Sequence, residues 1–175
     1  MTDSSTVNVA VVQAAACPFD TEAAVAKVCA MTAEAGSRGA DLVLFPEAYV
    51  GGYPWGLAFG TAVGGRSEPG RRAFGRYHAG AIDVPGPEVD QMCAAAAEAN
   101  VFLCVGVIER DSTYSGGTLY CTLLYISPEG ELVGKHRKLK PTAAERLIWG
   151  EGDGSTLTAI DTPLGTIGGL ICWEN

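Results

Sequence analysis

VFLCVGVI, residues 101–108, contains no charged or hydroxyl-bearing side chain. A strand with one face in water alternates apolar and polar residues, so this unbroken run predicts a strand that is buried on both faces. LVLF at residues 42–45 has the same character. We therefore expect both segments to be central strands of one covered sheet.

Helical patterns alternate with the predicted strands. Asp20 is suited to cap a helix that runs to about Gly36, and Gly86-Pro87 opens a second helix that reaches Asn100. This alternation, followed by a hairpin, predicts an α/β fold. The remaining predicted segments are strands at residues 7–15, 119–126, 131–139, 156–161 and 166–171, a hairpin turn at 127–130, and a long glycine- and proline-rich loop at 50–70.

The composition is that of a globular chain. Its 175 residues, 47% hydrophobic and 18% charged, suit one domain over residues 1–175, or one incomplete larger domain. The net charge of −8, without a basic stripe, argues against a nucleic-acid partner. The run 101–108 is far shorter than the roughly 20 residues that span a bilayer, and the N-terminus lacks a signal-peptide pattern. We therefore expect a cytoplasmic protein without a membrane partner.

The cysteines do not indicate a metal site. None of the six forms a C-x-x-C pair, and no histidine lies nearby at zinc-finger spacing. We expect most of them to be small buried side chains in a reducing compartment, and we expect neither a metal nor a cofactor.

Three side chains with catalytic potential lie at the ends of predicted strands. Glu47 follows LVLF and a proline, and Lys138 lies in the basic run 135–138. TIGGLICWEN, residues 166–175, predicts a buried strand that runs into a sharp turn carrying Cys172, which would expose its sulfur. Each residue alone has an ordinary explanation, namely a solvated carboxylate, a charged edge strand or a small buried thiol. Together they supply a base, a cation and a nucleophile.

Three motifs in order make the chain resemble a known family. They are FPEAYVGGYPWG at 45–56, HRKLKPTAAERLIWGEGDGST at 136–156 and ICWEN at 171–175. From Val7 to Asn175 the chain resembles the nitrilase branch of the carbon–nitrogen hydrolases. The resemblance implies a four-layer α-β-β-α sandwich. Because such proteins continue beyond the cysteine, it also implies that the C-terminal half of the fold is absent here, and that the isolated chain is aggregated, partly folded or dependent on a partner.

The resemblance also implies a role for each candidate. Cys172 matches the nucleophile, Glu47 the general base, Lys138 the cation that stabilises the tetrahedral intermediate, and Glu145 a second glutamate that holds the lysine and substrate. Lys138 is preferred to its neighbouring lysines because the motif places it directly after the arginine. Alternation along a strand supports this choice, since Lys138 and His136 face one way and Arg137 and Leu139 the other. Candidate substrate-binding residues are Tyr53, Trp55, Trp149 and Trp173.

The function implied is hydrolysis of a small-molecule nitrile to a carboxylic acid and ammonia, in a protein expected to be a homo-oligomer when complete. An amidase or a nitrile-hydrating enzyme with the same residues is the alternative within enzymes. A hydrolase that pairs the cysteine with His78 or His136 is a further possibility, ranked below these. The alternative from another class is an inactive or oligomer-binding fragment.

Overall fold

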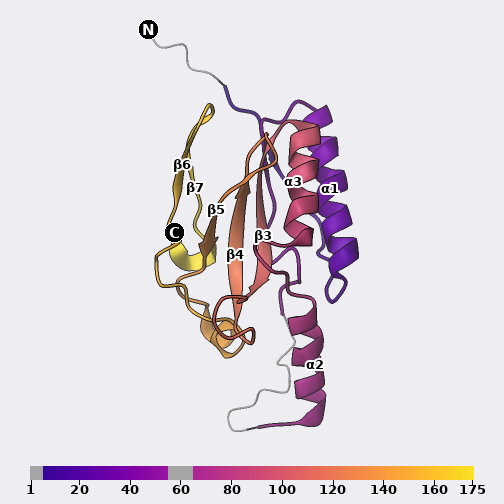
Figure 1. Ribbon diagram of the computed structural model, residues 1–175, viewed down its shortest axis with the longest axis vertical. Coiled ribbons are helices and arrows are strands. Elements are labelled where there is room, and N and C mark those ends of the chain that lie inside the picture. The colour runs from indigo at the N-terminus through magenta and orange to yellow at the C-terminus, as the bar shows by residue number, and fades with distance from the viewer. Residues whose placement is uncertain (1–5, 55–64) are drawn as a thin grey trace.

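A five-stranded sheet forms the centre of the computed structural model, which describes residues 6–54 and 65–175 (Figure 1). The strands stand in chain order, and the first three are parallel to one another while the last two are antiparallel to their neighbours. They are β1 (Val9–Val11), β2 (Leu42–Leu44), β3 (Phe102–Arg110), β4 (Leu119–Ile126) and β5 (Leu132–Arg137).

Two helices cover one face of this sheet. α1 (Thr21–Ser37) and α3 (Pro87–Ala99) lie side by side on it, while α2 (Glu68–Ala79) extends past the end of the sheet (Figure 1). On the other side of the sheet lies the antiparallel pair β6 (Ala159–Thr162) and β7 (Gly165–Gly168). Two short 3-10 helices, η1 (Ala143–Leu147) and η2 (Cys172–Glu174), complete the described elements.

The predicted α/β class and the main elements are confirmed. The side chain of Asp20 accepts a hydrogen bond from the amide of Ala23 and caps α1. α3 ends at Asn100, whose left-handed backbone (φ 53°) closes the helix. The helix layer and the large sheet correspond to two of the four layers that the resemblance implies.

The two faces of the sheet pack against different partners because side chains alternate along a strand. Val43 and Leu103 face the helices and pack in one core with Val28 of α1 and Met92 of α3. The opposite face forms a second core, made largely from alternate residues of β3 and β4 with contributions from the helix α2 and the C-terminal segment. Its members include Cys104, Cys121, Leu123, Tyr125, Tyr77 and Ile171. The candidate site lies on this second face.

The sequence did not predict α2. Its first residues fall in the segment 50–70, which was expected to be a loop, although residues 55–64 of that segment lie outside the described part. Ser67 accepts a hydrogen bond from the amide of Gly70, and Pro69 occupies the first turn, where its missing N–H costs nothing. Pro69, one of the residues that suggested a loop, therefore lies in the first turn of the helix, and Ser67 caps it.

The strand predicted at residues 166–171 is shorter and less buried than expected. β7 ends at Gly168, and Leu170 is 47% exposed. The next residue after β7, Gly169, instead lies against the side chains of β4, where a Cβ atom would come within 2.5 Å of Leu123 Cδ2. Its carbonyl accepts a hydrogen bond from the hydroxyl of Tyr125. Glycine allows this close approach, so the segment crosses the sheet rather than joining it. The strand predicted at 7–15 is likewise shorter, since β1 covers only three residues.

Candidate active site

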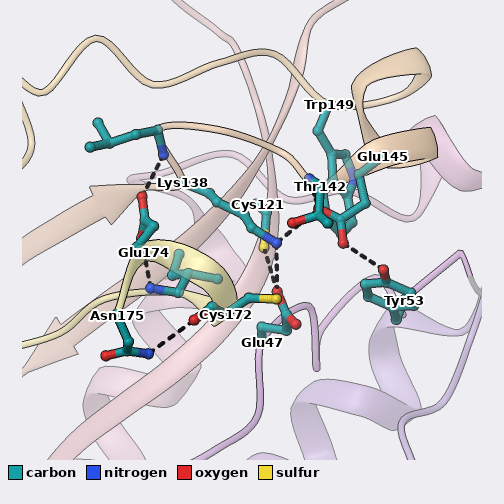
Figure 2. Close-up of polar contacts among 12 residues, drawn as sticks. Glu47, Tyr53, Cys121, Lys138, Thr142, Glu145, Trp149, Cys172, Glu174 and Asn175 are labelled. Carbon is teal, nitrogen blue, oxygen red and sulfur yellow. Dashed lines mark hydrogen bonds and ion pairs between the residues drawn. The ribbon is translucent and has the colours of Figure 1, made fainter.

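Glu47 lies in a turn that directly follows β2 and packs against β3. Gly106 makes this packing possible, because a Cβ atom there would lie 2.3 Å from the carbonyl oxygen of Pro46 and 2.6 Å from Cα of Glu47. The next residue, Ala48, has a left-handed backbone with φ 52° and is completely buried. The turn is thus fixed from both sides, and the Glu47 carboxylate projects from the second face of the sheet (Figure 2).

Lys138 follows β5 directly, and its side chain is only 1% exposed. Its Nζ lies 3.2 Å from Oε2 of Glu47 and 2.8 Å from Oε2 of Glu145 (Figure 2). Burial disfavours the charged ammonium, but the hydrogen bonds and charges of the two carboxylates outweigh it and raise the pKa of Lys138. The ammonium also lies 5.6 Å from the ring centre of Trp149. Lys138 is therefore a buried side chain whose charged form is favoured by its two carboxylate partners.

Glu145 occupies the first turn of η1, and its carboxylate accepts three hydrogen bonds. Its Oε1 accepts a hydrogen bond of 2.5 Å from the hydroxyl of Tyr53. Its Oε2 accepts one from Lys138 and another of 2.6 Å from the amide of Thr142. Burial opposes ionisation, yet these donors lower the pKa of the Glu145 carboxyl group. Glu145 is thus an anion that holds the lysine in place.

Cys172 begins η2 with a left-handed backbone (φ 58°) and is exposed. Cys172 and Glu47 line one pocket of about 360 Å³, together with Phe45, Leu123 and Leu170 among others. Figure 2 shows the sulfur and the Glu47 carboxylate turned toward each other. The structure therefore brings the thiol, both glutamates and the lysine into one place, although Glu47 lies 91 positions before Lys138 in the chain.

The neighbours of Lys138 point elsewhere. Lys135 and Arg137 donate to the buried carboxylate of Glu109 on the helix side of the sheet, each with a contact of 2.6 Å. Lys140 pairs with Glu151 at the surface. The predicted alternation is confirmed, and Lys138 is the member of this run that reaches Glu47.

The four aromatic candidates have different positions. The rings of Tyr53 and Trp149 meet edge to face with centres 5.6 Å apart, and Trp149 is buried beside Lys138. Trp173 is 81% exposed and does not line the pocket. Trp55 lies outside the described residues.

Two residues make contacts near the site that were not predicted from the sequence. The buried thiol of Cys121 lies 3.9 Å from Oε2 of Glu47. Its place on the inward face of β4 followed from strand alternation, but its contact with Glu47 did not. The second overlooked residue, Glu174, makes three hydrogen bonds beside the cysteine turn. Its position two residues after Cys172 was the only available signal.

The two histidines form hydrogen bonds with residues other than Cys172. His136 bonds to Glu174, and the ring of His78 bonds to the carbonyl of Gly116. Within residues 6–54 and 65–175, no cluster of three or more metal-ligating side chains is found. No helix in that same part of the chain has the length and hydropathy needed to cross a membrane.

The chain is similar in sequence to known nitrilases. The chain is 55% identical over 170 residues to the bifunctional nitrilase/nitrile hydratase NIT4A of Nicotiana tabacum, covering 97% of this chain and 48% of that protein. It is 56% identical over 166 residues to an aliphatic nitrilase of Sinorhizobium fredii (strain HH103), covering 95% of this chain and 52% of that protein. The chain thus spans about half the length of the curated relatives it matches.

Solved structures share the fold. Nit3 of Saccharomyces cerevisiae, a member of branch 10 of the nitrilase superfamily, aligns with a TM-score of 0.72 at 23% identity, over 96% of this chain and 56% of that one. An amidase from Nesterenkonia sp. aligns with a TM-score of 0.68 at 15% identity, over 96% and 56%. The family described as carbon-nitrogen hydrolase matches residues 8–175. This chain therefore belongs to the carbon–nitrogen hydrolase family.

Proposed function

We propose that the full-length protein is a nitrilase that hydrolyses a small-molecule nitrile to a carboxylic acid and ammonia, with Cys172 as its nucleophile. The observation that carries the proposal is the buried ammonium of Lys138, held between Glu47 and Glu145 beside the pocket that Cys172 lines. Burial of a cation is costly unless it is paired, and the two carboxylates supply the pairing. Such buried charged clusters are common at functional sites.

The first step joins the thiol to the nitrile. Glu47 takes the proton from Sγ of Cys172, the sulfur bonds to the nitrile carbon, and the proton passes to the nitrile nitrogen. The product is a thioimidate. The shared pocket of Glu47 and Cys172 supports this role, because a general base must lie within reach of the proton that it takes.

Two waters complete the reaction. Glu47 takes a proton from the first water as it adds to the thioimidate carbon, and nitrogen gains protons until the carbon–nitrogen bond breaks and ammonia leaves. The resulting thioester accepts a second water, the carbon–sulfur bond breaks, and the acid leaves with the thiol restored. One carboxylate serves as base in each step.

Lys138 stabilises the negative charge that develops on the oxygen or nitrogen atom of each tetrahedral intermediate. An ammonium held in a fixed position in a buried site stabilises such charge more strongly than it would in water. Glu145 keeps the ammonium in position through its hydrogen bond with Nζ, and Tyr53 supports Glu145 through a second hydrogen bond.

A nitrile-hydrating activity is the second candidate. It differs by one bond, since the first tetrahedral intermediate would lose sulfur instead of ammonia and release an amide. The tobacco relative is named for both activities, which favours this alternative over others. An amidase would enter the same path at that intermediate.

Product analysis tests these activities. Purified full-length protein is incubated with a nitrile and, separately, with its amide, while ammonia, acid and amide are measured. Acid and ammonia in equal amounts support a nitrilase, amide as the main product supports hydration, and turnover of the amide alone supports an amidase. Nitrile hydrolysis retained by Cys172→Ala would contradict the mechanism.

The alternative from another class is tested with the 175-residue chain by itself. Cooperative unfolding and nitrile turnover of this chain would contradict an inactive or oligomer-binding fragment, whereas association without turnover would support it. A homo-oligomeric state and a cytoplasmic location belong to the same proposal, and sedimentation of the full-length protein and cell fractionation test them.

A further inference from the structure

The carboxylate of Glu174 is surrounded by hydrogen-bond donors. Oε1 accepts from the amide of Leu139 at 2.6 Å, and Oε2 accepts from the amide of Ile171 at 2.6 Å and from Nε2 of His136 at 2.9 Å. The side chain is only 6% exposed. These bonds compensate the cost of burial and lower the pKa of Glu174.

These bonds connect the two halves of the candidate site. Leu139 directly follows Lys138, and Ile171 directly precedes Cys172. Glu174 therefore ties the segment that carries the cation to the segment that carries the thiol, as Figure 2 shows at the left of the site. Within residues 6–54 and 65–175, no other side chain joins these two segments by hydrogen bonds.

The thiol stands on a backbone that needs such support. Cys172 has φ 58°, a left-handed conformation that is unfavourable for a residue with a Cβ atom. Strained residues of this kind persist where the surroundings fix them. Glu174 fixes the residue before the strained position, and the side-chain amide of Asn175 donates to the carbonyl of Cys172 at 2.9 Å.

His136 supports Glu174 from inside the protein. Its ring is completely buried, and because the carboxylate can only accept, Nε2 carries the hydrogen of this contact. Its Nδ1 has no hydrogen-bond partner within the described residues. The imidazole therefore has one polar contact, and that contact is with Glu174.

We propose that Glu174, supported by His136, is a positioning residue that sets the sulfur of Cys172 against Glu47 and Lys138. The kinetic part of this proposal rests on the proposed function, but the placement of the sulfur does not. Glu174 touches no reacting atom in this proposal and acts through the backbone of the cysteine turn.

Glu174→Gln is the sharpest test because it preserves size and removes one acceptor. The two backbone donors approach opposite oxygens, so the amide nitrogen of glutamine must face one of them in either orientation. We expect kcat for the nitrile to fall about 100-fold, the cost of a displacement near 1 Å, with a smaller change in KM. The alkylation rate of Cys172 by iodoacetamide should change by at least about fivefold on the same grounds.

Glu151→Gln is the matched control, since it removes a carboxylate from an exposed pair with Lys140. It should leave both rates within about twofold, as surface pairs contribute little. His136→Ala, which removes one of three donors, provides a second variant if Glu174→Gln does not fold. It should shift both rates in the same direction and by less.

The outcomes are separable. A lower melting temperature with an unchanged alkylation rate in the folded Glu174→Gln and His136→Ala proteins would show a merely structural role and overturn the proposal. Unchanged kcat in both variants would overturn it as well. If the wild-type protein turns over no nitrile, the proposed function fails, while the alkylation comparison still decides whether Glu174 places the sulfur.

Discussion

The helices η1 and η2 use one local motif for two different purposes. In each, a buried glutamate accepts a hydrogen bond of 2.6 Å from the amide three residues earlier, Glu145 from Thr142 and Glu174 from Ile171. The remaining donors differ, because Glu145 receives a lysine ammonium and Glu174 receives an imidazole and a second backbone amide. Glu145 thus holds the lysine ammonium, whereas Glu174 holds two backbone segments together.

This difference teaches that the local motif does not set the role. A glutamate three residues after the start of a short helix commonly satisfies a free backbone donor. What each carboxylate does beyond that depends on the element packed against it, and both η1 and η2 meet the end of β5 at Lys138 or Leu139. Variants of residues in the two short helices, and of Lys138 between them, therefore distinguish a carboxylate that holds the lysine ammonium from one that positions the backbone.

The largest effect is expected at the residue that η2 presents. Cys172→Ala should lower nitrile turnover by more than about 1,000-fold, because a nucleophile acts in every step. The residue is exposed, so the melting temperature should change little. Steady-state ammonia release and thermal unfolding check both statements, and near-normal turnover would exclude Cys172 as the nucleophile.

Removal of the Lys138 ammonium, which Glu145 of η1 holds, should cause the next largest loss of turnover. Lys138→Ala leaves Glu47 and Glu145 without their cation, and we expect turnover to fall about 100- to 1,000-fold. Because one partner of a buried pair is lost, the free energy of unfolding should fall by about 3–5 kcal/mol. Urea unfolding and ammonia release measure the two effects.

Lys135→Ala serves as the control for that experiment. Its ammonium pairs with Glu109 on the opposite face of the sheet, and Arg137 continues to neutralise that carboxylate. Turnover should stay within a few-fold of wild type, as for other pairs away from the site. Equal damage from both variants would show that the assignment of Lys138 is wrong.

A smaller effect is expected when the support of the charge is weakened but the charge remains. Glu145→Gln should lower turnover about 100-fold through misplacement of Lys138, with a milder loss of stability. Tyr53→Phe removes one donor to Glu145 and should cost about tenfold. A larger loss for Tyr53→Phe than for Glu145→Gln would mean that Tyr53 acts on the substrate and not through the glutamate.

The sequence predicted the parts of the site that depend on short-range pattern. Alternation along one strand separated Lys138 from its neighbours, and the resemblance supplied Glu145. The two helices on the sheet followed from caps and a three- to four-residue period. These predictions needed no knowledge of what packs against what.

The rest depended on contacts between distant segments. Cys121 and Glu47 lie 74 positions apart, and Leu139 and Glu174 lie 35 apart, so no local pattern signals either contact. The strand predicted at residues 166–171 is present but ends at Gly168, for the same reason. Its apolar letters indicated burial, but Gly169 allowed the segment to lie against the side chains of β4 instead of continuing as a strand.

The pH dependence of the free energy of unfolding should show the combined contribution of ionised Glu145 and Glu174. Although burial raises their pKa values, their donors outweigh it, and the folded-state pKa values of Glu145 and Glu174 lie below the unfolded value of about 4.3. Their contribution is therefore complete above about pH 4.3 and is lost as pH falls through the folded values. The pKa of Lys138 is raised, so its contribution to stability is complete below about pH 10.4 and is lost as pH rises further.

Urea midpoints measured from pH 2 to 11 test this expectation. We expect a plateau between about pH 5 and pH 10 with a fall at either end. Glu174→Gln should flatten the acid fall, because it removes one of the groups that must take up a proton. A fall that begins above pH 6 in the wild-type protein would show that other groups control the acid side.

The smallest effect is expected from substitution of Trp173. This variant contrasts the tryptophan in η2 with Trp149, which lies next to η1. Trp149, next to η1, is buried beside Lys138, whereas Trp173 in η2 is 81% exposed and does not line the pocket. Trp173→Ala should therefore change the free energy of unfolding by no more than about 0.5 kcal/mol, as at other exposed positions. The sequence-based prediction that Trp173 binds substrate is tested by KM in the same variant. A rise in KM with unchanged stability would support it, whereas unchanged KM would leave η2 with the single task of presenting the thiol.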